Sequence, residues 1–122
     1  MKIALALVAA FASLSASAAT LPSRKACDAK ITILTELVRA TESRFSVGET
    51  DAVDVYSSQL NLLDQQLTCG AITREQYCAK ENQDKMSAIV QNMIDLRNVG
   101  QRGTEDVNAV QLRQADFNEI CQ

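Results

Sequence analysis

The sequence contains no histidine and no tryptophan, and the missing histidine removes several classes of function. A chain without histidine has no His-ligated metal site and no histidine acid–base catalysis. A Ser or Cys nucleophile would then depend on a Lys or carboxylate base, and the sequence has no Gly-rich phosphate-binding loop. We therefore expect a protein that is not an enzyme and that carries no cofactor and no metal.

Positive charge and helix-breaking residues are also scarce. The 122 residues include 12 Lys and Arg against 15 Asp and Glu, which gives a net charge of −3. Proteins that bind nucleic acid need clustered positive charge to neutralise phosphates, so we expect no nucleic-acid partner. Because the chain has only one Pro and four Gly, long stretches are free to form helix.

The N-terminal segment has the pattern of a secretory signal peptide. Lys2 precedes an apolar run over residues 3–14, and Ala16-Ser17-Ala18 follows as a small-residue cleavage signature. The run is shorter than the ~20 residues needed to span a bilayer, and no later segment is apolar enough. We predict a signal peptide over 1–18 and a single helical domain over 19–122, without a membrane span in the mature chain. The protein would be exported, to the periplasm or as a secreted product.

Apolar residues recur at steps of three and four in four segments, and no segment alternates with period two, so the pattern predicts helices and no strands. Ser23 is a candidate N-cap, and Gly70 is placed to end a helix. Thr73 with Gln76 forms a capping-box pattern, and Thr104 is followed by two acids. The predicted helices cover residues 23–46, 51–68, 73–98 and 104–121. The stripes are Cys27-Ile31-Leu34-Val38-Thr41-Phe45, Val53-Tyr56-Leu60-Leu63-Leu67, Ala79-Asn82-Met86-Ile89-Met93-Leu96 and Val107-Val110-Gln114-Phe117-Cys121.

An internal repeat relates positions 52 residues apart. Such self-similarity indicates duplication of one supersecondary unit. We predict two tandem helical hairpins, repeat 1 over about 23–70 and repeat 2 over about 73–122, that form a small four-helix bundle. The clearest matches are Val47-Gly48 with Val99-Gly100, Asp54-Val55 with Asp106-Val107, and Gln59-Leu60 with Gln111-Leu112.

Four cysteines in an exported chain favour two disulfides, and their spacing is too wide for a four-Cys zinc site. If the first hairpin turns at Gly48, Cys27 and Cys69 lie equally far from the turn and come level in an antiparallel helix pair. Cys78 and Cys121 come level in the second hairpin. We predict Cys27–Cys69 and Cys78–Cys121; the other two connectivities stay open, because all four cysteines gather at one end.

Around the first turn a set of residues stands at fixed spacing: Arg44, Phe45, Gly48, Asp54, Val55, Gln59, Leu62 and Leu63. With these residues, the stretch over about 36–67 resembles part of the TolC outer-membrane efflux protein family. In that family the stretch forms the periplasmic tip of a coiled-coil hairpin that meets a periplasmic adaptor protein, and each chain has two such hairpins. A full member is several times longer and contributes barrel strands. The resemblance therefore implies hairpin tips without a channel.

A second pattern, over residues 67–80, consists of Leu67, Gly70, Ile72, Thr73, Glu75, Gln76, Tyr77 and Lys80. It is similar to the short helical SHOCT domain, and this similarity implies an oligomerisation or interaction role. Together these patterns predict an exported protein-interaction module, docking through the first hairpin tip onto a helical partner of an envelope transport or secretion complex. The residues expected at that contact are Arg44, Phe45, Gly48, Glu49, Asp54, Val55 and Tyr56. Asp51, Gln101 and Arg102 are further candidates at the two turns.

Other functions stay open at this point. The helices could hold a small molecule or an ion between them, or the chain could be an exported inhibitor or effector of another protein. Self-association into a homo-oligomer is a further expectation, because the apolar stripes exceed what one four-helix core covers.

Overall fold

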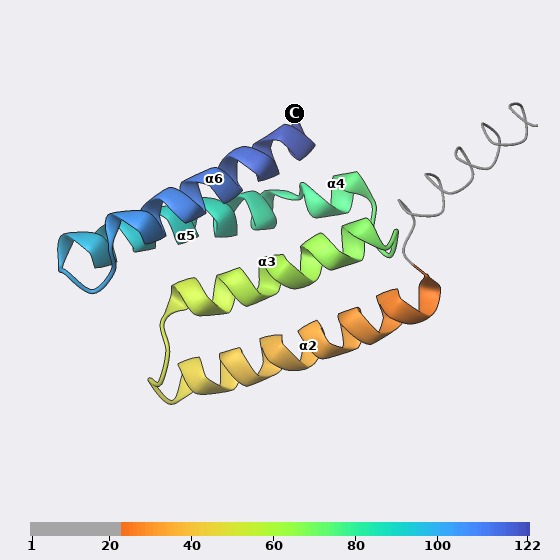
Figure 1. The fold of residues 1–122 in the computed structure, drawn as a ribbon, viewed down its shortest axis with the longest axis horizontal. Coiled ribbons are helices and arrows are strands. Elements are labelled where there is room, and N and C mark those ends of the chain that lie inside the picture. The colour runs from red at the N-terminus through yellow and green to blue at the C-terminus, as the bar shows by residue number, and fades with distance from the viewer. Residues whose placement is uncertain (1–22) are drawn as a thin grey trace, which may run out of the picture.

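The computed structural model describes residues 23–122, so the predicted signal peptide over 1–18 lies outside the described residues. Within residues 23–122 the chain forms five helices and no strand, which confirms the all-α fold (Figure 1). The helices are α2 (Arg24–Ser46), α3 (Ala52–Thr68), α4 (Arg74–Tyr77), α5 (Lys80–Asn98) and α6 (Thr104–Cys121).

The helices form two antiparallel hairpins, α2 with α3 and α5 with α6, as predicted. Figure 1 shows both hairpin turns at one end of the molecule and the α3–α4 connection at the other. The second helix of the first hairpin, α3, packs on α5 and joins the two hairpins into one bundle. Helix α2 lies at the edge of the bundle and packs mainly against α3.

The core lies between α3, α5 and α6. Leu60, Met86, Ile89 and Val107 are its largest fully buried side chains, and burying such a side chain is worth roughly 1.5–3 kcal/mol. Most of the predicted α2 stripe lies outside this buried core, because α2 has one main helical neighbour. The buried cluster contains Val53, Leu60, Tyr77, Met86, Ile89, Met93, Val107 and Phe117. Of the six α2 stripe residues only Cys27 and Thr41 are buried.

Two disulfides close the ends of the hairpins opposite the turns. They join Cys27 to Cys69, with the Cα atoms 5.8 Å apart, and Cys78 to Cys121, with the Cα atoms 5.5 Å apart. This confirms the predicted connectivity. Each bridge closes a loop of 42 or 43 residues in sequence, and the chain-entropy model assigns each roughly 4 kcal/mol of stabilisation.

The helix predicted over 73–98 is interrupted, which corrects the sequence-based expectation. The capping box of Thr73 and Gln76 is present, but α4 ends at Tyr77, and Ala79 is extended with φ −55° and ψ 149° before α5 begins. The buried Asn82 side chain donates from Nδ2 to the carbonyls of Gln76 (3.2 Å) and Tyr77 (3.1 Å). These bonds satisfy carbonyls that a continuous helix would have paired, so the break is stabilised.

The break places the buried Tyr77 in a polar network that links α3, α4 and α6. The Tyr77 hydroxyl donates to Oδ1 of Asp64 at 2.6 Å, and Arg113 Nη2 donates to Oδ2 of the same carboxylate at 3.0 Å. The Tyr77 and Phe117 rings lie 5.1 Å apart. Burial, reinforced by the bond to the Asp64 carboxylate, raises the pKa of Tyr77 well above its usual value.

Substitution Tyr77→Phe should lower the free energy of unfolding by about 1–2 kcal/mol at neutral pH, because it removes one bond to a charged group. The raised pKa gives a pH signature. Stabilisation by the protonated Tyr77 is complete below the ordinary tyrosine pKa of 10.0 and is lost as the pH rises toward the folded-state pKa. Urea unfolding at a series of alkaline pH values measures this loss.

The wild type should lose stability through this pH range, whereas Tyr77→Phe should lose less. Tyr56→Phe is the matched control, because it removes a tyrosine hydroxyl and leaves the hydrogen bond between Tyr77 and Asp64 in place. Residues 23–122 include no free cysteine, so the folded domain has no thiol that could attack its disulfides during these measurements. Equal pH dependence in the wild type and Tyr77→Phe would contradict the role of this hydroxyl.

Candidate functional site: the paired turns

The two hairpin turns have the same backbone geometry. Gly48 has φ +77° and Gly100 has φ +78°, a conformation that residues with a side chain rarely adopt. The N–H of Gly48 donates to the Phe45 carbonyl (3.0 Å) and the N–H of Gly100 to the Arg97 carbonyl (3.0 Å). The next N–H of each turn reaches one residue further back, which completes a Schellman motif at the end of each helix. The sequence repeat is therefore also a repeat of backbone structure.

An arginine of the second turn connects the two turns. Arg102 Nη2 lies 3.6 Å from Asp51 Oδ2 and 3.7 Å from Asp54 Oδ1. Asp51 also caps α3 by accepting from the Asp54 N–H at 3.1 Å, and Asp54 accepts from the Thr50 hydroxyl. The ion pairs hold residues 46–51 and 98–104 next to each other, and we call these two segments the paired turns.

Apolar side chains are exposed on both of the paired turns. Val47 and Val99 occupy equivalent positions in the two repeats, immediately before the turn glycine, and each is 69% exposed. Phe45, in the last turn of α2, is about half exposed. Sequence reasoning did not select Val47 or Val99, although the 52-residue repeat of a valine before glycine was the signal that could have identified them.

The predicted contact residues divide into exposed and interior groups. Arg44 and Glu49 are exposed and approach to 4.0 Å, and Gly48 and Gln101 are exposed at the turns. The interior group is Asp54, Val55 and Tyr56. Asp54 is partly buried in the ion pair with Arg102, Val55 is 8% exposed, and Tyr56 packs partly buried against the core.

A pocket of about 390 Å³ lies where the start of α3 meets the end of α5, next to the paired turns. Val53, Leu96 and Val99 give it an apolar wall, and Asp51 and Asp95 place carboxylates at it. The pocket is of a size and character to take an apolar side chain of a partner. It is lined by Asp51, Ala52, Val53, Asn92, Asp95, Leu96 and Val99.

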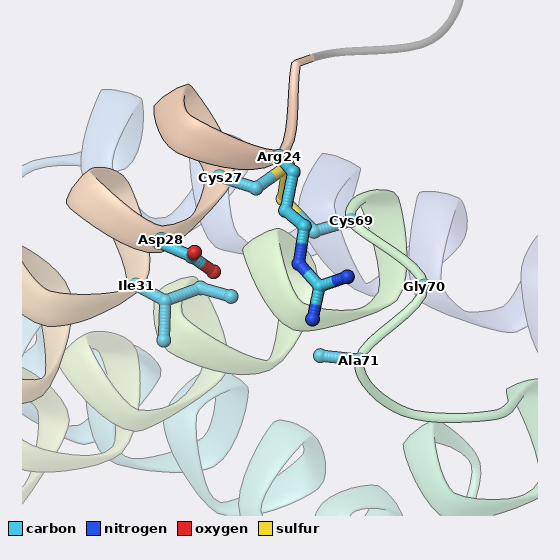
Figure 2. A pocket seen from close by; sticks show the side chains of 7 residues that line it. All are labelled: Arg24, Cys27, Asp28, Ile31, Cys69, Gly70 and Ala71. Atoms are coloured by element: carbon cyan, nitrogen blue, oxygen red, sulfur yellow. A yellow bond between two sulfur atoms is a disulfide. The ribbon is translucent and has the colours of Figure 1, made fainter.

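A second hollow, of about 450 Å³, lies at the opposite end of the molecule beside the first disulfide. Figure 2 shows the Arg24 side chain extending past the Cys27–Cys69 bridge toward Ala71. Asp28 and Ile31 form the α2 wall of this hollow. The bonded sulfurs are neither nucleophiles nor thiolate ligands, so the hollow offers one cation and one carboxylate beside a structural cross-link.

Across residues 23–122, no cluster of three or more His, Cys, Asp or Glu side chains could hold a metal ion. None of the helices in this part of the chain is long and apolar enough to cross a membrane. The strongest candidate for a functional site is the surface of the paired turns with the pocket next to them, because Val47 and Val99 are exposed there.

Comparison of the chain with models of known protein families, with curated proteins and with solved structures found no match.

Proposed function

We propose that this chain is an exported, non-enzymatic protein-interaction module that binds a protein partner through its paired turns. The observation that carries the proposal is the exposure of Val47 and Val99 at equivalent positions of turns that Arg102 holds together. The two turns lie at the same end of the molecule (Figure 1), and exposed apolar side chains on a small domain mark candidate interaction sites.

The composition of the paired turns suits a protein contact. Val47, Val99 and Phe45 offer apolar area, and burying a Val or Phe side chain in an interface is worth roughly 1.5–3 kcal/mol. Arg44 and Glu49 lie beside them as exposed charges of opposite sign, which would set orientation more than affinity. Val55 and Tyr56 would contribute indirectly, because they are buried and partly buried and fix the start of α3.

The resemblance to the TolC family suggests what kind of partner to expect. Its motif residues Arg44, Phe45 and Gly48 fall at the first turn, where the family's hairpin tip meets an adaptor protein. We therefore propose that the partner is a helical component of an envelope transport or secretion complex. An exported inhibitor or effector would use the same surface and differ only in the identity of the protein that it binds.

The proposed location follows from the cysteine chemistry. Two disulfides are typical of a protein in an oxidising compartment. With the signal-peptide pattern over residues 1–18, this supports export to the periplasm or beyond.

Ligand binding between the helices is the alternative function. Leu60, Met86, Ile89 and Val107 fill the space between α3, α5 and α6, but a hollow of about 510 Å³ lies between α3, α4 and α5, where Leu63, Ile72 and Asn82 help to line it. A ligand that co-purifies with the protein and raises its melting temperature would favour this alternative.

Photo-cross-linking in the cells that make the protein tests the partner-binding proposal. Probes placed singly at Val47, Glu49 and Val99 should capture the same protein, because all three positions belong to the paired turns. A probe at Glu75, exposed in α4 at the opposite end, is the control and should not. Mass spectrometry identifies the captured protein.

The double substitution Val47→Asp with Val99→Asp should then weaken binding of the captured protein by at least about tenfold, since each valine contributes on the order of 1.5 kcal/mol when buried. Calorimetry with the purified partner measures the affinity, and circular dichroism checks that the helices are intact. Capture from Glu75 as strong as from Val47, or no capture from any probe, would contradict the proposal.

Replacing Arg102 by Met should loosen the paired turns without unfolding the domain. The ion pairs are partly exposed, so their loss should cost no more than about 1 kcal/mol of stability. Spin labels at the exposed Glu49 and Gln101 positions report the distance between the turns. We expect a narrow distance distribution in the wild-type background and a broad one with Arg102→Met.

Arg97→Met is the matched control. Arg97 lies at the same end of the molecule, and it forms none of the ion pairs within residues 23–122. Its distance distribution should stay narrow. An unchanged distribution in Arg102→Met would show that packing, and not this arginine, aligns the turns.

A further inference from the structure

Helix α2 has a second stripe that none of the helices within residues 23–122 covers. Next to the stripe that faces α3, a parallel stripe repeats at the same alternation of three and four residues, which is the spacing of a helix–helix seam. Ile33 is 63% exposed in it, and Leu37 is about half exposed. This outer stripe, named here the α2 seam, consists of Lys30, Ile33, Leu37, Ala40 and Arg44.

The equivalent stripe of the second repeat is covered. Positions 52 residues further along lie on α5, where the counterpart of Leu37 is Ile89, with 0% exposure. Helix α5 packs against two long helices, α3 and α6, whereas α2 packs mainly against α3. The α2 seam therefore matches the α5 side of the α3–α5 interface, and no helix in the described part of the chain packs against it. The counterparts on α5 are Asn82, Lys85, Ile89, Asn92 and Leu96.

The α3 side of the α3–α5 interface also has a counterpart in the second repeat. The α3 stripe that contributes Val53 and Leu60 to the core has its counterpart on α6, where Leu112 corresponds to Leu60. Leu112 is 67% exposed. This second stripe, named here the α6 seam, consists of Glu105, Asn108, Leu112, Ala115 and Glu119, the counterparts of Val53, Tyr56, Leu60, Leu63 and Leu67.

The internal interface fixes how the two seams would meet. Helices α3 and α5 are antiparallel, because α3 runs away from the turns and α5 runs toward them (Figure 1). Val53 and Leu96 line one pocket at the turn end, and Leu60 and Ile89 belong to one buried cluster. This antiparallel register places Leu67 at the level of Asn82.

Transferring this register to the seams brings opposite charges together at both ends. Glu105 comes to Arg44 and Glu119 comes to Lys30, while Leu112 comes to Leu37 in the middle. Lys30, Glu105 and Glu119 form none of the ion pairs within residues 23–122, and Arg44 has only the exposed pair with Glu49. The register taken from the α3–α5 interface and the opposite charges of the two seams thus lead to the same conclusion: each seam fits the other.

We infer that the α6 seam of one copy of this chain docks on the α2 seam of a second copy. The contact reproduces the α3–α5 interface between molecules, with ion pairs at the two ends in the positions of Val53 with Leu96 and of Leu67 with Asn82. It is heterologous, joining different faces of the two copies, so association continues head to tail. The inference does not rest on the proposed function, because neither seam includes the exposed valines of the paired turns.

Sedimentation of the purified, disulfide-bonded protein tests this inference. The mean mass should rise steadily with protein concentration, without stopping at a dimer, because each added copy presents a free seam. Association should weaken when the salt concentration is raised from about 0.05 to 0.5 M, since exposed ion pairs are screened.

Two single substitutions block one seam each. Leu37→Glu places an acid against the acidic α6 seam, and Leu112→Glu puts a charge at the apolar centre of the contact. Each variant alone should be monomeric, with association weakened by at least about tenfold. An equimolar mixture should form a one-to-one dimer and nothing larger, because each molecule keeps one intact seam. Val99→Glu is the control at an equally exposed apolar position and should associate like the wild type.

The charge pairs test the register. Arg44→Glu should weaken association about two- to fivefold, and adding Glu105→Arg in the same chain should restore it. Adding Glu119→Arg instead should not, because Glu119 meets Lys30 in the antiparallel arrangement.

Three outcomes would overturn the inference. The first is a wild-type protein that stays monomeric at high concentration. The second is a Leu112→Glu variant that still associates while Leu37→Glu does not, since that pattern means a symmetric contact between two α2 seams. The third is a mixture of the two variants that stays monomeric. Circular dichroism of each variant distinguishes these outcomes from loss of the fold.

Discussion

The packing of α3 against α5 is the contact on which the arrangement of this molecule depends. Each hairpin is closed by its own turn and its own disulfide, so neither covalent link joins one hairpin to the other. The burial of Leu60 with Met86 and Ile89 makes one bundle of the two. The placement of the turns follows from this contact, because it brings Arg102 within reach of Asp51 and Asp54.

The same contact makes the two repeats structurally unequal. Helix α5 is enclosed between α3 and α6, whereas α2, among the helices of residues 23–122, packs mainly against α3. Equivalent positions therefore have different environments, as with the buried Ile89 and the half-exposed Leu37. In a duplicated hairpin, the interface between the two hairpins forms only once. Each edge of the bundle then keeps one helix face that matches one side of this interface and is not paired. The acids on α6 and the bases on α2 are what give those edges opposite character.

The turns and the seams are two regions of the surface with separate roles, and Arg44 is the one predicted contact residue that they share. The paired turns lie at one end and present valines on rigid Schellman motifs, which suits recognition of a different protein. The seams lie along the sides, where the repeat geometry suits a second copy of the chain. Head-to-tail association would leave the paired turns free and present them several times along an assembly, which would raise the avidity for a repetitive partner.

The sequence by itself determined the local structure, because the responsible interactions are local. Helical periodicity, the Ser23 and Thr73 caps and the turn glycines depend on neighbours within a few residues. Hairpin symmetry around the two turns favoured the cysteine pairing that the structure confirms, while two other connectivities stayed open. Tertiary structure alone decided the interruption at Ala79, where the buried Asn82 binds carbonyls of the preceding helix, and the enclosure of Val55. It also decided which stripes stay exposed, because a heptad pattern specifies that a face needs a neighbour and not which helix supplies it.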